Sequence, residues 1–414
     1  MWIVFVAVVA ATVITAATFV AVRLIAPPPA ATVRVQAATT VLLDGTAPPP
    51  IPTPDTGSFA LATSMAGTIA TRDVATVRPI GSVAKAMTAL VVLSAHPIGP
   101  GADGPSITMT SADVALYRQA VAEGGSNLRV RAGEVLTERD LLLALLLPSA
   151  DNIAETLAVW VSGNRGAFVA RLNATAAALG MDATHFADPS GISVRTVSTA
   201  ADLVALARAV IANPVLAELV RTAQAALPDG TVLKNLDILL NRQPGWLGIK
   251  TGWTGAAGGC LLFADEMHYD TGNTVIVWGA VLGQPPDGSG DGAHPELGQA
   301  FLSAQQAVTA AVAAYAAVDL SAVPPQVSGS ITTRWGINGP VVLSPFAASD
   351  LVFIRVGAVL RIHVSVLAPR APIPTGATVA EVTGVLNAKT SITWKVVSTT
   401  AIAAPSPWWK LFSG

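Results

Sequence analysis

The sequence predicts an α+β domain followed by a small all-β domain, with an apolar helix in front of both. Three observations carry this prediction. The middle of the chain consists of apolar and amphipathic helical segments, residues 246–282 change to short runs rich in β-branched residues, and alternating strand patterns follow Pro324-Pro325. With 414 residues the chain is also too long for one ordinary core, which favours two domains.

Composition excludes several classes of protein. Hydrophobic residues make up 52% of the chain and charged residues 12%, a balance that excludes general disorder. A net charge of −2 without a basic cluster gives no attraction to nucleic acid, so no nucleic-acid partner is expected. Cys260 is the single cysteine, which excludes a disulfide framework and a cysteine-rich metal site. The five histidines follow no recognisable pattern.

The N-terminus predicts a transmembrane or signal segment over residues 1–25. Met1 to Val22 is an uncharged apolar run, long enough to cross a bilayer and rarely found in soluble cores. Arg23 alone flanks it, and the positive-inside rule weakly favours the cytoplasm for the side that follows the span. Residues 26–56, rich in Pro, Ala and Thr, are expected to be a linker between the membrane and the first domain.

The first domain is expected over residues 57–318. Two apolar segments around Gly67 predict a hairpin, and the run after Ser82 predicts a helix that is covered on all sides. Further helices are expected in the middle of the chain, then three neighbouring strands, and then a long helix that packs on them. These elements are placed at 58–71 (hairpin), 83–94, 141–147, 153–161, 166–179 and 199–211 (helices), 246–253, 259–264 and 275–282 (strands) and 295–315 (helix).

The second domain is expected over residues 322–402, where turns built on Gly or Pro recur about every ten residues between alternating runs. No site is expected in it. Residues 403–414 form a tail with Trp408-Trp409 beside Lys410, a pattern that fits either a membrane interface or packing against the domain itself.

Ser82 and Lys85 are the first candidate site residues. A spacing of three places both on one face of the helix that starts here, within reach of each other. Burial disfavours the charged form of a lysine, and a neutral amine beside a serine hydroxyl is a base beside a nucleophile. The alternative is a capping serine and a lysine that extends to solvent.

A second candidate stretch lies on the first strand after the helical region. Lys250 supplies a positive charge, Thr251 supplies a hydroxyl, and Gly252 leaves room for a substrate against the backbone. A carboxylate would find both charge and hydrogen bonds there. The alternative is an ordinary edge strand that carries a lysine.

Ser82-x-x-Lys85, a serine-headed triplet at Ser149 and Lys250-Thr251-Gly252 follow one another in the order that is known from penicillin-binding proteins and serine β-lactamases. With their surroundings, among them Asp188-Pro189-Ser190-Gly191 and Trp253, they resemble the low-molecular-mass penicillin-binding proteins of the D-alanyl-D-alanine carboxypeptidase family over roughly residues 57–318. The resemblance implies a β-lactamase-like catalytic fold, an antiparallel sheet with helices plus a helical subdomain. It also implies a small β domain after the catalytic one, and export with attachment to the membrane.

The resemblance further implies a serine peptidase without metal or cofactor. Ser82 would attack the carbonyl of the penultimate D-Ala of a peptidoglycan stem peptide, with Lys85 as base and Ser149 as proton relay. Lys250 and Thr251 would hold the substrate carboxylate, and backbone N–H groups of Ser82 and of Trp253 or Thr254 would bind the oxyanion. A β-lactam antibiotic would acylate the same serine. The expected place of action is the outer face of the cytoplasmic membrane.

One position departs from the family pattern. The triplet is Ser149-Ala150-Asp151 where the family has asparagine in third place, and the asparagine follows at Asn152. A carboxylate at this place accepts hydrogen bonds where an amide donates, and it favours the charged form of Lys85. Asp151 and Asn152 therefore both remain candidates for the substrate-binding role. A D,D-endopeptidase and a catalytically weak penicillin- or wall-binding protein are the alternative functions.

Overall fold

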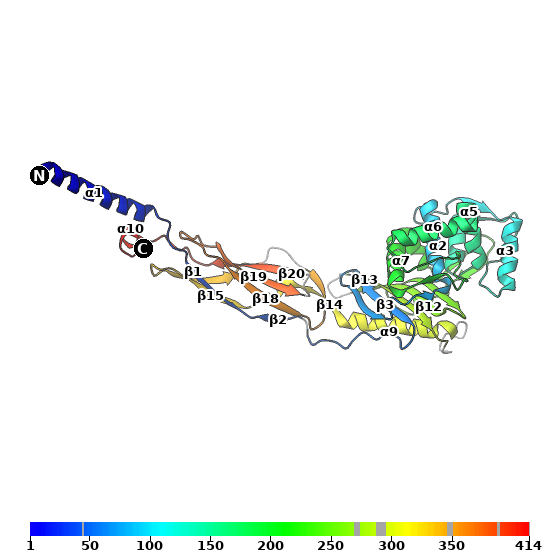
Figure 1. Cartoon of the computed structure of the whole chain (residues 1–414). Helices are drawn as coiled ribbons and strands as arrows, with labels where there is room; N and C mark the ends of the chain where they lie inside the picture. Colours follow the sequence, from blue (N-terminus) through cyan, green and yellow to red (C-terminus); the bar gives the residue numbers. More distant parts are fainter. Residues whose placement is uncertain (44, 269–273, 287–294, 346–350, 387–389, 414) are drawn as a thin grey trace. The chain divides into compact units, whose positions relative to one another are not determined.

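The computed structural model describes the whole chain except residues 44, 269–273, 287–294, 346–350, 387–389 and 414 (Figure 1). The described residues form two compact units. The first, here called the mixed unit, is Pro49–Tyr315, and the second, the β unit, combines Met1–Pro48 with Ala316–Gly414. The two units are described separately.

A five-stranded antiparallel sheet is the centre of the mixed unit. Its strand order is β11-β12-β13-β3-β4, so the predicted hairpin lies beside the three predicted later strands. The prediction of these strands is confirmed, and the later ones are longer than expected. Their bounds are β3 Ser58–Thr63, β4 Gly67–Arg72, β11 Trp246–Thr254, β12 Gly258–His268 and β13 Thr274–Gln284.

Helices cover both faces of this sheet (Figure 1). On β3, Ala60 and Ala62 belong to the core that the sheet shares with the helical region, whereas Phe59 and Leu61 are equally buried outside that core. Because successive side chains of a strand point to opposite faces, the second pair faces the other side, where α9 (Gly298–Ala314) packs on β12 and β13. The predicted helix after the sheet is thus confirmed.

Helix α2 (Ala84–Ala95) lies at the centre of the helical region, in contact with α4, α5, α6 and α7. Nearly all of its side chains are buried, as its uninterrupted apolar run predicts. The helix α3 that lies beside α5 was not predicted. The other helices are α3 Ser111–Ala122, α4 Glu138–Leu146, α5 Asp151–Ser162, α6 Arg165–Ala178, α7 Ala200–Ala212 and α8 Pro214–Val220.

Short elements connect these helices and strands. They are β5 Arg78–Pro79, β6 Ser106–Thr108, β7 Val135–Thr137, β8 Val197–Ser198, β9 Gln224–Ala226, β10 Val232–Lys234 and the 3-10 turns η1 Gly81–Val83, η2 Ile238–Asn241 and η3 Pro295–Leu297.

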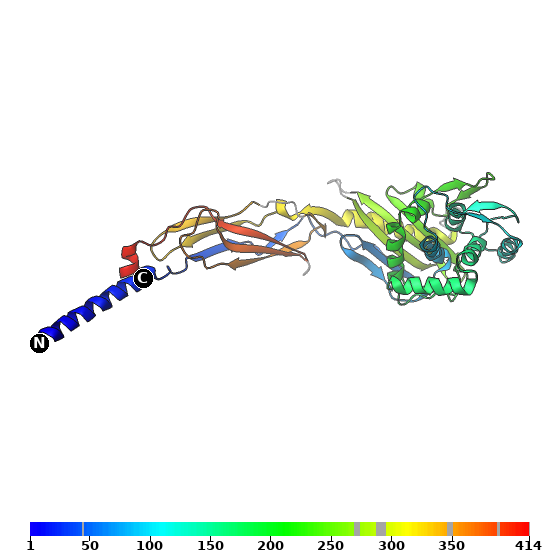
Figure 2. The ribbon, with the colours of Figure 1, turned by 90° about the horizontal axis from the view of Figure 1, so that it is seen from above.

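The β unit contains a seven-stranded antiparallel sheet of order β1-β15-β16-β20-β19-β18-β2. Leu360, Val382 and Trp394 are among the side chains of its own hydrophobic core. In Figure 2 strands from the start of the chain (blue) lie beside strands from its end (orange and red). The strands are β1 Thr32–Ala37, β2 Thr40–Leu42, β15 Val327–Thr332, β16 Asn338–Leu343, β18 Val359–Val366, β19 Thr378–Leu386 and β20 Thr390–Ser398; β14 Tyr315–Asp319 pairs with β17 Leu351–Arg355, and η4 is Leu320–Ala322.

The prediction of a linker over residues 26–56 is wrong for residues 32–42, which contain two strands of the β unit. Strand β1 pairs with β15 from Thr32↔Thr332 to Ala37↔Val327, and β2 pairs with β18. These strands are short and gain their stability from partners about 300 residues away, so no local pattern marks them. The β unit therefore contains strands that precede the mixed unit in the sequence and strands that follow it. Its second part begins at Ala316 rather than at the expected 322.

The β unit has a helix at each end of the chain, α1 at the N-terminus and α10 at the C-terminus. Helix α1 (Trp2–Ile25) has no buried residue and is long and apolar enough to cross a membrane. Lys410 of α10 (Pro407–Phe412) donates to the carbonyls of Leu24 at 2.8 Å and Ala26 at 3.0 Å, which lack helical partners at the end of α1. Trp409 packs against Trp335, whereas Trp408 stacks with Phe412 and is exposed.

Candidate active site

The entry into α2 brings the first two candidate residues together. Ser82 lies in the 3-10 turn η1 and Lys85 in the first turn of α2, and Lys85 Nζ is 2.8 Å from Ser82 Oγ. Lys85 is fully buried, which contradicts the alternative of a lysine that extends to solvent. The arrangement joins a hydroxyl nucleophile to a buried amine.

Two further acceptors surround the Lys85 amine. Its Nζ lies 2.6 Å from Oδ1 of Asp151 and 2.9 Å from the carbonyl oxygen of Ser190. With Ser82 Oγ, these atoms accept all three N–H bonds of a lysine ammonium. A base needs the neutral amine, and the Asp151 carboxylate stabilises the charged form instead. The site thus holds Lys85 in a buried ion pair beside the hydroxyl that it would deprotonate.

The structure places Asp151, not Asn152, beside Lys85. Asn152 Oδ1 accepts from the backbone N–H of Leu128 at 2.9 Å, and its Nδ2 donates to the Leu128 carbonyl at 3.0 Å. The backbone N–H of Asp151 donates to the carbonyl of Ser126 at 2.8 Å. Both residues at the start of α5 are therefore tied to the segment 126–128, and this fixes the direction of the Asp151 side chain.

Ser149 stands in the turn between α4 and α5 with φ of 67°, in the left-handed region that favours glycine. Its Oγ is buried and has no hydrogen-bond partner among the described residues. A strained backbone and an unsatisfied buried hydroxyl are features that occur at functional sites.

Strand β11 brings the second candidate stretch against η1. Lys250 and Thr251 are buried, whereas Trp253 is 46% exposed. A Cβ added to Gly252 would lie 2.9 Å from the carbonyl oxygen of Ile80 and 3.0 Å from the backbone nitrogen of Ser82. The chain can therefore bring β11 this close to the nucleophile because residue 252 is a glycine.

Burial and, to a smaller extent, the charge of Lys85 lower the pKa of Lys250 to about 7, against the opposing effect of Asp151 and Asp237. Asp237 accepts from Nε1 of Trp246 at 2.8 Å, and burial raises its own pKa to about 6. In the described surroundings Lys250 donates to its neighbour's carbonyl, that of Thr251, at 3.2 Å. Lys250 is thus a buried cation whose charge is easily lost near neutral pH.

Sequence reasoning did not assign a role to the segment 188–191. The Asp188 carboxylate accepts from Ser190 Oγ and from the backbone N–H of Gly191 and Ile192, and this holds the Ser190 carbonyl toward Lys85. A Cβ on Gly191 would lie 1.9 Å from the carbonyl oxygen of Gly81, so the segment packs directly on η1. The signal was present, since Asp188-Pro189-Ser190-Gly191 is part of the family pattern.

The chain is similar to known proteins over much of the mixed unit. The family model for D-alanyl-D-alanine carboxypeptidase (peptidase S11) matches residues 49–278. The chain is 37% identical over 195 residues to the D-alanyl-D-alanine carboxypeptidase DacB2 of Mycobacterium tuberculosis, covering 46% of this chain and 62% of that one. It is 33% identical over 205 residues to a D-alanyl-D-alanine endopeptidase of Pseudomonas aeruginosa, and this match covers 48% of this chain and 63% of that one. The matches thus span less than two thirds of these two relatives.

Among solved structures, the Streptomyces K15 DD-transpeptidase matches with a TM-score of 0.53 and 27% sequence identity, and the match covers 63% of this chain and 98% of that one. The expected fold of the mixed unit, that of the penicillin-binding proteins, is thereby confirmed.

Proposed function

This chain belongs to the D-alanyl-D-alanine carboxypeptidase family of serine peptidases, and we propose from that premise that it removes the terminal D-alanine from peptidoglycan stem peptides. The observation that carries the proposal is the 2.8 Å approach of the buried Lys85 amine to Ser82 Oγ. The one cysteine is no competing nucleophile, because burial raises the pKa of Cys260 to about 12 and leaves it a thiol.

In the first step Ser82 Oγ attacks the carbonyl carbon of the penultimate D-Ala, and neutral Lys85 takes the hydroxyl proton. The new C–O bond forms as the C–N bond to the terminal D-Ala breaks. Ser149, whose buried Oγ has no described partner, passes a proton to the leaving amine. Water then attacks the ester, the C–O bond to Ser82 breaks, and the shortened peptide leaves with a new carboxylate.

The substrate is held on the side of β11. Lys250 and Thr251 bind the terminal carboxylate by charge and hydroxyl, and the backbone N–H groups of Ser82 and Trp253 stabilise the oxyanion. The close packing of Gly252 on η1 supports this assignment, because it brings the two backbone segments together. Asp151 takes the place of the family's asparagine and acts on the substrate and on Lys85.

Two alternatives have specific support. A relative named as an endopeptidase favours cleavage of cross-links. The ion pair between Lys85 and Asp151 favours a weak catalyst that still binds penicillin, since it stabilises the lysine in the form that cannot act as base.

One experiment separates these functions. The full chain, purified in detergent, is incubated with a fluorescent penicillin, with a pentapeptide ending in D-Ala-D-Ala and with a cross-linked muropeptide. Covalent labelling together with D-alanine release from the pentapeptide supports the carboxypeptidase, and faster cleavage of the muropeptide supports the endopeptidase. Labelling without turnover supports the weak binding protein. Labelling that persists in Ser82→Ala would refute the assignment of the nucleophile.

We further propose that α1 holds the chain at the outer face of the cytoplasmic membrane, where the wall substrate is found. The fully exposed apolar helix supports this, because its side chains need a lipid environment. Recovery of the full-length protein in the cytosolic fraction would contradict it.

A further inference from the structure

A groove of about 680 Å³, here called the arginine groove, lies between α3 and the segment 129–132. Three arginines line it, and no carboxylate is among the described residues that form it. The arginines are not a run in the sequence, so only the fold gathers them. The lining residues are Ser111, Val114, Tyr117 and Arg118 of α3, and Arg129, Val130, Arg131 and Ala132 of the segment.

The backbone that carries the arginines is fixed at both sides of the groove. The lining residues of α3 are spaced by three or four positions and therefore share one face of the helix. In the segment, Val130 is buried between Arg129 and Arg131, which are both exposed. The Asn152 amide holds both backbone groups of Leu128, just before this segment. The three guanidinium groups are thus presented by anchored elements.

The arginines of the groove have no counter-charge of their own. Within the described ranges none of the three guanidinium groups forms an ion pair. Asp113 accepts from threonines at the start of α3 and on α5, and Glu134 accepts from the backbone N–H of Arg131. Hydrogen bonds from Thr231 and, to a smaller extent, the charge of Arg131 lower the pKa of the exposed Asp229. The nearby carboxylates are therefore satisfied by other donors.

We propose that the arginine groove binds carboxylates of a peptidoglycan strand while another stem peptide of the same strand is in the active site. The inference rests on the proposed function. A stem peptide ends in a carboxylate both before and after the terminal D-Ala is removed, so a strand with several stems is a polyanion. Guanidinium groups bind carboxylates through two parallel N–H bonds, which suits arginines better than lysines to this role. The half-buried ring of Tyr117 adds apolar surface for the sugars of the strand.

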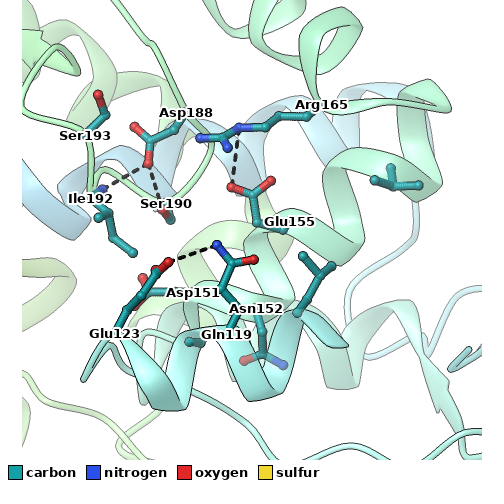
Figure 3. Close-up of a pocket in the computed structure, with 13 residues that line it drawn as sticks. Gln119, Glu123, Asp151, Asn152, Glu155, Arg165, Asp188, Ser190, Ile192 and Ser193 are labelled. Atoms are coloured by element: carbon teal, nitrogen blue, oxygen red, sulfur yellow. Dashed lines mark hydrogen bonds and ion pairs between the residues drawn. The ribbon is translucent and has the colours of Figure 1, made fainter. Parts of the chain in front are cut away.

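Helix α3 connects the groove to the catalytic region. Gln119 and Glu123 of α3 line a separate cavity that also has Asp151, the partner of Lys85, in its wall (Figure 3). An α-helix with its side chains is about 10–12 Å across. A strand that carries several stems can therefore occupy both places, and binding in the groove raises the effective concentration of the next stem at Ser82. The gain is in KM, and a single repeat unit does not show it.

The test compares two substrates on the full chain, purified in a neutral detergent. One is a soluble, uncross-linked peptidoglycan strand with several pentapeptide stems, and the other is a single disaccharide-pentapeptide unit of that strand. D-Alanine release gives kcat/KM per stem. The groove variant combines Arg118→Gln, Arg129→Gln and Arg131→Gln. The matched control removes the same charge at exposed positions of the β unit and combines Arg34→Gln, Arg334→Gln and Arg361→Gln.

We expect kcat/KM per stem to be at least about tenfold higher for the strand than for the single unit, in the parent and in the control. In the groove variant the ratio falls to about threefold or less, and the rate with the single unit stays within about twofold of the parent rate. Because the contacts are exposed ion pairs, about 500 mM salt also lowers the parent ratio.

An unchanged ratio in the groove variant would overturn the strand site and leave the proposed function intact. An equal fall in both rates would overturn it too, because the arginines would then act through the fold. A parent chain that releases no D-alanine from either substrate would refute the proposed function itself. The rates are repeated in micelles that contain phosphatidylglycerol. A difference between parent and groove variant that occurs only with this anionic lipid would assign the groove to a membrane surface and overturn the proposal.

Discussion

The side-chain nitrogen of Lys85 lies 2.6 Å from Oδ1 of Asp151, closer than its 2.8 Å distance to the hydroxyl of Ser82. A carboxylate at this position opposes the use of Lys85 as a base, because an opposite charge within a few ångströms stabilises the ammonium form. The ion pair is buried, so solvent screens it little.

Asp151→Asn should therefore speed acylation at neutral pH. The change removes the ion-pair partner of Lys85, which leaves its amine freer to accept the proton of Ser82, and we expect labelling at pH 7 to be several-fold faster. The rate of labelling by fluorescent penicillin at pH 7 checks this. The matched control is Asp55→Asn, at an exposed position. An unchanged labelling rate in Asp151→Asn would show that the carboxylate does not govern Lys85.

Asn152→Ala should lower the stability of the fold, even though Asn152 does not contact Lys85. The amide of Asn152 satisfies both backbone groups of Leu128, and its loss leaves a buried donor and a buried acceptor unpaired. We expect a loss of about 1–3 kcal/mol in the free energy of unfolding, seen as a lower Tm.

The control for this change is Asn127→Ala, because Asn127 is exposed and donates a single hydrogen bond, to the carbonyl of Gly125. Its loss should cost less than about 1 kcal/mol. Equal destabilisation by both changes would mean that the Asn152 contacts do not hold the start of α5.

The same residues show what sequence can and cannot predict here. Ser82 and Lys85 are three positions apart, in η1 and in the first turn of α2, so local spacing was sufficient to bring them together. The choice between Asp151 and Asn152 depends on Leu128, which contacts Asn152 through tertiary structure and leaves no mark in the spacing. The cavity that Asp151 and Ser190 line likewise depends on α3 and on the segment 188–193, which come from separate parts of the chain.

The two strands in the expected linker escaped prediction for a similar reason. The Pro, Ala and Thr content of residues 26–56 is typical of a tether, and the pairing of Val33 with Ile331 is visible only in the folded sheet. By contrast, the later strands of the mixed unit follow from short β-branched and apolar runs separated by turn residues, and this is a local signal.

Gly252→Ala should slow acylation strongly. A Cβ at this position meets the backbone of Ile80, Ser82 and Val83 within about 3 Å, so β11 has to move away from η1. The oxyanion contacts are then lost, and removal of one such donor costs about 10²–10³ in rate. Penicillin labelling measures the effect.

Gly255→Ala is the matched control, since a Cβ at that nearby glycine has no neighbour within 4 Å. Its labelling rate should stay within about twofold of the parent rate. If Gly252→Ala also labelled at the parent rate, the approach of β11 to Ser82 would have no part in acylation.

Lys250 should give the peptide reaction a basic limb near neutral pH. With a pKa of about 7, Lys250 in the free protein is charged below that pH and neutral above it. A substrate carboxylate needs the charged form, so kcat/KM should fall as the pH rises through 7, by up to about tenfold per unit. A bound carboxylate stabilises the charge of Lys250, so kcat at saturating substrate should fall only at higher pH.

A substrate with a C-terminal amide separates this limb from the ionisation of other groups. It lacks the carboxylate, so its kcat/KM, though lower overall, should show no decline near pH 7. In Asp151→Asn the limb of the carboxylate substrate should move to lower pH, because Asp151 is one of the two charges that raise the pKa of Lys250. Parallel pH profiles for the carboxylate substrate and the amide substrate would show that Lys250 does not bind the carboxylate. This outcome would not bear on the roles of Ser82 and Lys85.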